Sequence, residues 1–198
     1  MSEQPEKFYS RGAKQFAQNY SIENMPEAYI GLLDEFSEKV NEGKVLDAGC
    51  GPGRDTQYLT EKGLNVTGID LAEGMIQHAK ENKKGKFRLM NVKDLEFPKN
   101  EFDGIWCNTV IHFFPPEQMP EVIGELKRVL KPGGTVYISL KIGNGTFMRE
   151  KYDNEVKQYL VTEEKARKMI QEKGLEIKQV NTAEISGPTI MNFLTEAK

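Results

Sequence analysis

Residues 45–56 constrain the fold more than any other part of this 198-residue chain. They read Val-Leu-Asp-Ala-Gly-Cys-Gly-Pro-Gly-Arg-Asp-Thr: a short apolar run, three glycines at alternate positions, and the start of a helix-like segment. An α/β sheet builds a nucleotide site from a buried strand, a glycine-rich turn and a helix, because small residues admit the ligand to the backbone and the helix N-terminus presents unpaired N–H groups. The segment therefore predicts an α/β sheet with a ligand site at this turn.

Strand-like and helix-like segments alternate over most of the chain. We predict strands at 44–48, 65–70, 86–90, 102–107 and 135–140, and helices at 54–62, 72–82, 115–130 and 162–173. This alternation predicts a parallel sheet with helices on both faces. The last two strands, 175–182 and 190–195, flank a turn signal at 186–188 and are expected to pair antiparallel. Residues 141–161 have weak periodicity and contain Gly143-Asn144-Gly145, which predicts a loop or insertion.

The first 43 residues carry apolar side chains at helical spacing, among them Phe8, Phe16 and Phe36. Asn24-Met25-Pro26 divides the run into two predicted helices. Because no repeat, low-complexity segment or linker interrupts the chain, we expect a single domain over 1–198. It consists of an N-terminal helical lid (1–43) on an α/β core (44–198).

Charge and composition argue against several classes of function. The net charge of −3 disfavours a nucleic-acid binder that relies on a basic face. No apolar run approaches the roughly 20 residues of a membrane helix, and the first 25 residues lack a signal-peptide core. Cys50 and Cys107 are the only cysteines, and there are two histidines, so we expect reduced thiols, no metal site and a cytoplasmic location.

The glycine spacing favours one kind of nucleotide ligand. A dinucleotide fingerprint has the spacing G-x-G-x-x-G, but here Arg54 stands where the third glycine would be. Asp70 ends the second predicted strand, where a carboxylate can accept both ribose hydroxyls. The pattern predicts a ligand with adenosine and ribose but no phosphate; the alternative is simply a tight strand–helix turn.

Four separated motifs then resemble those of the class I S-adenosylmethionine-dependent methyltransferases, in the family's order. They are residues 47–53, residues 68–75, residues 94–98 with 101–106, and residues 125–134, and the resemblance covers about 9–197. It implies a Rossmann-like seven-stranded, mostly parallel sheet with helices on both faces and an antiparallel last strand. It also implies S-adenosyl-L-methionine as the cofactor, bound across the carboxyl ends of the first, second and fourth strands.

The resemblance further implies roles for individual residues. The glycines of the turn would lie against the methionine and ribose, Asp70 would hold the ribose hydroxyls, and Asn91 would accept from the adenine amino group, although many relatives carry aspartate there. Asn108 would meet the methionine ammonium through its backbone carbonyl. The full set of expected cofactor-binding residues is Tyr20, Asp47, Gly49, Gly51, Gly53, Asp70, Leu71, Met75, Asn91, Val92 and Asn108.

Candidates for chemistry at the acceptor are few. His112 follows the fourth predicted strand and is the one candidate for a general base; packing of its ring against the loop is the preferred interpretation. Tyr20 is expected at the methionine carboxylate, with a packing role as its alternative. Arg149, Lys151 and Tyr152 fall where relatives recognise substrate, although a solvated charged loop is the preferred interpretation.

The sequence thus predicts an enzyme that transfers a methyl group from S-adenosylmethionine to a small-molecule acceptor by in-line displacement. A non-catalytic S-adenosylmethionine-binding module or partner protein is the alternative, and an NAD(P)-dependent oxidoreductase is a weaker one. A small molecule is the expected partner, and nucleic acid and membrane are not. A monomer is the default expectation, with a dimer left open.

Overall fold

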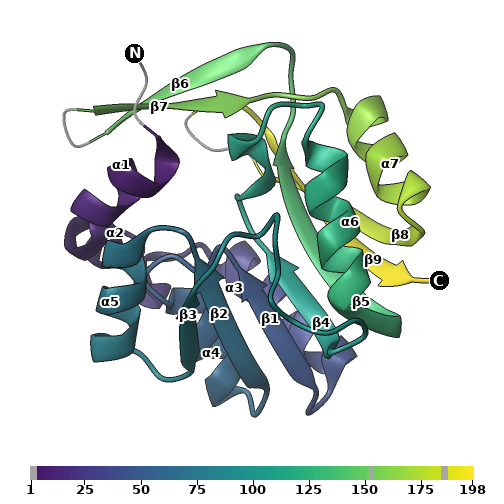
Figure 1. Ribbon diagram of the computed structural model, residues 1–198, viewed down its shortest axis with the longest axis horizontal. Helices are drawn as coiled ribbons and strands as arrows, with labels where there is room; N and C mark the ends of the chain where they lie inside the picture. Colours follow the sequence, from purple (N-terminus) through teal and green to yellow (C-terminus); the bar gives the residue numbers. More distant parts are fainter. Residues whose placement is uncertain (1–3, 152–153, 184–186) are drawn as a thin grey trace.

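The computed structural model describes residues 4–151, 154–183 and 187–198. Its main sheet has seven strands in the order β3-β2-β1-β4-β5-β9-β8 (Figure 1). β9 runs antiparallel to both of its neighbours, and the other pairs are parallel. This confirms the predicted seven-stranded, mostly parallel sheet. The strands are β1 (Lys44–Ala48), β2 (Asn65–Asp70), β3 (Lys86–Leu89), β4 (Phe102–Cys107), β5 (Leu130–Lys141), β8 (Leu175–Ala183) and β9 (Ile190–Ala197).

Helices cover both faces of this sheet, as predicted. The helices α3 (Glu27–Val40) and α4 (Arg54–Glu61) share one apolar cluster with the sheet, and α6 (Met119–Val129) and α7 (Glu163–Glu172) share another. In the view of Figure 1, α6 lies in front of the sheet and α3 behind it. The helix α5 (Glu73–Asn82) packs against β2 and β3.

The central strands are apolar on both sides because both faces are covered. Along β1, Val45 points into the cluster with α3 and α4, and Leu46 points into the cluster with α6 and α7. Trp106 in β4 faces the α3 side, where its ring stacks on Tyr137 of β5 with centroids 3.8 Å apart. Strands buried on both faces lose the polar alternation of a one-sided sheet, which explains the near-continuous apolar runs.

The N-terminal segment is helical, as predicted, but it is divided differently. The expected first helix is two short helices, α1 (Pro5–Arg11) and α2 (Ala13–Asn19), which meet at Gly12. A 3-10 turn at Ile22–Asn24 then leads into α3. Since α1 contacts both α5 and β7, this segment reaches across the carboxyl end of the sheet.

The segment 141–161, predicted to be a loop or insertion, is an insertion with regular strands rather than a loop. This segment forms β6 (Thr146–Lys151) and β7 (Asn154–Tyr159), which pair antiparallel as a separate two-stranded sheet. Figure 1 shows the hairpin crossing above the main sheet, between α7 and α1. Its faces mix apolar and charged residues, so it lacks the alternation that marks a strand beside an apolar core. Tyr152 lies outside the described residues.

Two boundaries near α6 also differ from the prediction. The helix begins at Met119 rather than at 115, because Pro115 accepts from the backbone N–H groups of Gln118 and Met119 in a preceding turn. The strand β5 begins at Leu130, where its pairing with β4 contains a register shift. That irregularity accommodates the Pro-Gly-Gly stretch at 132–134, which separates the predicted helix from the predicted strand.

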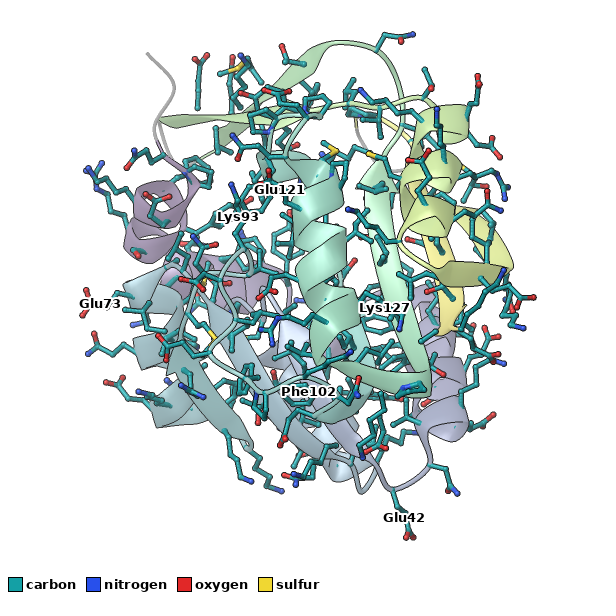
Figure 2. The ribbon with its side chains drawn as sticks, turned by 45° about the vertical axis from the view of Figure 1, so that its right-hand side comes forward. Glu42, Glu73, Lys93, Phe102, Glu121 and Lys127 are labelled. Carbon is teal, nitrogen blue, oxygen red and sulfur yellow. The ribbon has the colours of Figure 1, made fainter. Side chains whose placement is uncertain are left out.

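Labelled side chains in Figure 2 mark the two ends of the main sheet. Lys93, which follows β3, pairs with Glu121 of α6 at 3.4 Å toward the carboxyl end of the sheet. Phe102 is buried at the opposite end, where β4 begins. Within the described residues, no helix is both long and apolar enough to span a membrane.

Candidate active site

A cavity of about 1320 Å³ lies at the carboxyl ends of the parallel strands. Its floor comes from the turns that follow β1, β2, β3 and β4, and its roof comes from α1, α2 and the β6–β7 hairpin. Ordinary ligand pockets measure roughly 300–1,000 Å³. The cavity is therefore large enough for a nucleotide-sized ligand together with a second small molecule.

The glycine turn of the floor requires the residues that the sequence places there. Gly49, Gly51 and Gly53 have φ of 80°, 53° and 87°, the left-handed region that favours glycine. A Cβ at Gly49 would overlap Val110, whereas a Cβ at Gly51 would meet nothing within 4 Å. Gly49 and Gly51 line the cavity, but Gly53 is the N-cap residue before α4 and lies against the ring of Phe87.

Asp70 ties the glycine turn to the end of β2. One carboxylate oxygen accepts from the backbone N–H of Gly51 at 2.9 Å, and the other accepts from Ala72 at 2.8 Å. Burial raises the pKa of Asp70 and outweighs these backbone hydrogen bonds, which lower it. Asp70 and the neighbouring Leu71 and Met75 line the cavity, with Leu71 exposed and Met75 almost fully buried.

Asp47 lies beneath the turn rather than in the cavity. Its side chain is buried and accepts from the hydroxyl of Thr56 at 2.6 Å, which links the end of β1 to the first turn of α4. Burial, reinforced by the charge of Asp55, raises the pKa of Asp47 to about 8. A structural role in orienting the turn therefore fits its geometry better than direct contact with a ligand.

A buried polar network beside the turn was not predicted from the sequence. Asp55 accepts from Tyr29 Oη at 2.6 Å, from Trp106 Nε1 at 3.1 Å and from Arg54 at 2.7 and 2.9 Å. Burial opposes ionisation of Asp55, but Arg54 and the other donors outweigh it and lower its pKa. The network fills the space at the start of α4, and Arg54, Asp55 and Tyr29 all line the cavity.

Asn108 extends this network to the end of β4. Its side-chain amide donates to Tyr29 Oη at 2.8 Å, and its carbonyl accepts from Ser139 at 3.0 Å. The next residue, Thr109, has φ of 57°, a strained value for a β-branched residue, and its N–H donates to Ser139 at 2.6 Å. Both ends of the Asn108 side chain are thus held by protein, which leaves its backbone to meet a ligand.

Asn91 and Val92, after β3, line the cavity as expected. The side-chain oxygen of Asn91 accepts from the backbone N–H of Lys93 at 3.0 Å. A carbonyl oxygen has two lone pairs, so this bond leaves one acceptor position for a ligand.

His112 and Tyr20 also line the cavity. His112 is only 2% exposed. Its Nδ1 has no hydrogen-bond partner among the described residues. Burial, followed by the charges of Lys141 and Arg149, holds its pKa well below the usual value. Tyr20 accepts from Arg149 at 2.9 Å, a bond that joins α2 to the hairpin.

Most of the predicted site residues therefore come together, although the structure divides them into two groups. Gly53 and Asp47 support the turn from outside the cavity, and the other nine predicted cofactor-binding residues line it together with His112. The residues missed were Tyr29, Arg54, Asp55 and Lys141. An arginine followed by an acidic residue at a predicted helix start was a visible signal for Arg54 and Asp55. No sequence spacing linked Tyr29 or Lys141 to the turn.

Known proteins share this arrangement. A family profile described as a methyltransferase domain matches residues 46–138, which include the glycine turn and the first five strands of the sheet up to Ile138. The malonyl-acyl-carrier-protein O-methyltransferase of Salmonella typhimurium is 32% identical over 132 residues, or 65% of this chain and 49% of that protein. The phosphoethanolamine N-methyltransferase of Plasmodium falciparum is 30% identical over 150 residues, or 73% of this chain and 55% of that protein.

The chain spans about half the length of these curated relatives. Among solved structures, the 1,6-didemethyltoxoflavin-N1-methyltransferase of Burkholderia thailandensis, crystallised with 1,6-didemethyltoxoflavin and S-adenosylhomocysteine, aligns with a TM-score of 0.71. The alignment covers 100% of this chain and 92% of that one at 19% identity, a likeness of fold. Over residues 46–138 the chain thus matches a methyltransferase domain, and its strand order and glycine turn are similar to those of the class I S-adenosylmethionine-dependent methyltransferases.

Proposed function

We propose that the protein is an S-adenosylmethionine-dependent methyltransferase that transfers a methyl group to a small-molecule acceptor by in-line displacement. One observation carries the proposal: a cavity of about 1320 Å³ is lined by the Gly49–Gly51 turn, by Asp70 and by His112, and it is larger than a nucleotide-sized ligand alone requires. The relatives named above are methyltransferases, and their printed names include small acceptors. The whole chain acting as one domain, in the cytoplasm, is part of the same proposal.

The floor of the cavity suits the parts of this cofactor. In the proposed complex, the ribose hydroxyls bind Asp70, the methionine lies along Gly49 and Gly51, and the adenine lies between Leu71 and Met75 with its edge at Asn91 and Val92. The cofactor supplies a methyl group already activated by its sulfonium. The protein's own task is to orient the acceptor and exclude water.

The network at the start of α4 supports a cofactor without phosphates. A dinucleotide places its pyrophosphate against the N–H groups of this helix terminus. Here the Asp55 carboxylate already occupies the first turn of the helix. The Asp55–Arg54 ion pair carries no net charge, which favours a cofactor without phosphates at this place over one with a pyrophosphate. Arg54 and Tyr20 line the cavity side by side, where we propose that the methionine carboxylate lies. Asn108 completes this end, with its backbone carbonyl toward the methionine ammonium.

His112 is proposed to bind the methyl acceptor through a hydrogen bond. Because its pKa is well below the usual value, the ring is neutral at neutral pH. Its Nδ1, which has no partner in the described part of the chain, can accept a hydrogen bond from an acceptor hydroxyl or amine. Burial and the two nearby cations, Lys141 and Arg149, oppose a full positive charge on the ring. We therefore propose that His112 orients the acceptor through a hydrogen bond and does not take its proton completely.

Calorimetry with the purified protein tests the cofactor. We expect S-adenosylhomocysteine to bind and NAD to give no heat, and Asp70→Asn to weaken binding at least tenfold, since charge-assisted hydrogen bonds contribute roughly 1.5–3 kcal/mol each. Asp94→Asn is the control, because Asp94 is an exposed carboxyl outside the cavity. Failure of S-adenosylhomocysteine to bind would overturn the proposal. Binding without production of S-adenosylhomocysteine from S-adenosylmethionine in a metabolite extract would favour the non-catalytic alternative.

A further inference from the structure

One end of the cavity holds two cationic side chains. Lys141 is the last residue of β5, lines the cavity and is only 3% exposed. Its ammonium donates to Gln158 Oε1 at 2.6 Å and lies 5.1 Å from the centroid of the Phe147 ring. Arg149, on the same face of β6 as Phe147, is half-buried and also lines the cavity. Both cations therefore face the space beneath the hairpin.

Neither cation has a carboxylate partner in the described part of the chain. Among residues 4–151, 154–183 and 187–198, no acidic oxygen lies within 4.0 Å of Lys141 or Arg149. The two charges also act on each other: burial, reinforced by Arg149, lowers the pKa of Lys141 to about 8. The acidic residues that line the cavity are Asp55, which Arg54 holds, Asp70 on the floor, and Glu6 and Glu150 on the roof, the last exposed on the outer face of β6.

Further polar groups at this end are unsatisfied. The Nδ1 of His112 and the Nε2 of Gln158 are buried without a partner in the described residues. Lys141 has three N–H donors and uses one of them on Gln158. A buried ammonium without a counter-charge is costly, and the cost is recovered when an anion with hydrogen-bond acceptors occupies the site. Arg149 adds a planar fork that suits carboxylate or phosphate oxygens.

We infer that the methyl acceptor carries an anionic group, a carboxylate or a phosphate, which Lys141 and Arg149 bind at the β5 end of the cavity. This inference rests on the proposed methyltransferase function. The remainder of the acceptor is apolar or aromatic, because Phe113, Phe114 and Phe147 line the same cavity, and Phe147 lies directly beside the Lys141 ammonium. Arg149 also donates to Tyr20 of α2, so the anion site lies where the two parts of the roof meet.

A matched set of probes tests the inference by calorimetry on protein loaded with S-adenosylhomocysteine. The probes are 3-phenylpropionate, 3-phenylpropyl phosphate and 3-phenylpropanol, which share a body and differ in charge. We expect at least one of the anions to bind roughly tenfold or more tightly than the alcohol, the weight of one charge-assisted hydrogen bond. Preference between the two anions identifies which acid group the site takes.

Variants locate the effect. Lys141→Met should remove roughly tenfold of the anion affinity and leave the alcohol unchanged, and Arg149→Gln should act in the same direction. Lys157→Met is the matched control, because this substitution removes the same charge from the opposite face of the hairpin. The Lys157 ammonium lies there over the Tyr159 ring. Equal binding of anion and alcohol, or full anion affinity in both cavity variants, would overturn the inference.

Cofactor binding separates the two levels of failure. Each variant is first titrated with S-adenosylhomocysteine, which also checks that it is folded. If the wild-type protein does not bind S-adenosylhomocysteine, the proposed function fails, and the anion titrations are made on the cofactor-free protein. If it binds S-adenosylhomocysteine but does not prefer the anions, only the anionic acceptor is wrong.

Discussion

Substituting Gly49 by alanine should destabilise the protein in two separable ways. The first is conformational, because φ of 80° costs a non-glycine residue about 1–2 kcal/mol. The second is steric, because the new Cβ would overlap Val110, and overpacking of this kind costs about 1–3 kcal/mol. The sum predicts a loss of about 2–5 kcal/mol in the free energy of unfolding, before any effect on cofactor binding.

Two companion variants separate these contributions. Gly51→Ala carries the conformational cost alone, because φ is 53° and a Cβ there meets nothing within 4 Å, so we expect about 1–2 kcal/mol. Combining Gly49→Ala with Val110→Ala should recover the steric part. In a double-mutant cycle with Val110→Ala alone, the coupling energy should be favourable by about 1–3 kcal/mol.

Urea unfolding of the ligand-free protein measures all four variants. Trp106 is the only tryptophan and is fully buried, so its fluorescence reports the loss of the core. Equal losses in Gly49→Ala and Gly51→Ala, together with zero coupling to Val110, would refute the argument that Val110 is what requires glycine at position 49. Cofactor affinity is then measured on the same samples, and Gly51→Ala should lose it despite the smaller effect on stability.

Three further predictions concern buried polar groups. Tyr29→Phe removes a hydroxyl shared by three partners and should cost about 2–3 kcal/mol in urea unfolding, whereas Tyr58→Phe, near the surface, should cost under about 1 kcal/mol; equal costs would contradict the network. In the folded protein the pKa of Asp47 is raised to about 8, so its contribution to the free energy of unfolding is complete below about pH 4 and is lost as the pH rises toward 8, by at most about 1.4 kcal/mol per pH unit. Asp47→Asn should remove this decline of stability with pH, and an unchanged decline in the variant would show that Asp47 titrates normally. The pKa of His112 is lowered in the folded protein, so its effect on stability has the opposite pH dependence: stability should fall as the pH drops below about 6.5. The stability of His112→Asn should not change over that range, and a parallel decline in wild type and variant would exclude the histidine as its source.

The sequence predicted those parts of the fold that depend on local pattern or on burial from both sides. The strands β1, β2 and β4 are mostly buried because helices cover both faces, and their positions followed directly from the apolar residues they contain. The turn was equally predictable, because glycine at three alternate positions is typical of left-handed backbone close to a ligand. Asp70 followed from its place at the end of β2.

The hairpin and the polar network could not be predicted in this way. Along β6, Phe147 and Arg149 face the cavity together, so the strand has no consistently apolar side. Its stability comes from pairing with β7 and from the cavity wall, which are long-range features. Tyr29, Asp55 and Trp106 come from three elements separated in the sequence, and only the packing of α3 on the sheet brings them within hydrogen-bond distance.

The bond between Arg149 and Tyr20 joins residues 129 positions apart in the sequence, and it closes the cavity from above. The floor is built from the loops of the main sheet, whereas the roof is built from α1, α2 and the hairpin, which lie to either side of those loops in the chain (Figure 1). Evolution can therefore exchange the roof by insertion, deletion or substitution in two short stretches without recoding the floor. One cofactor site can in this way serve a succession of different acceptors, with the hairpin as the interchangeable part.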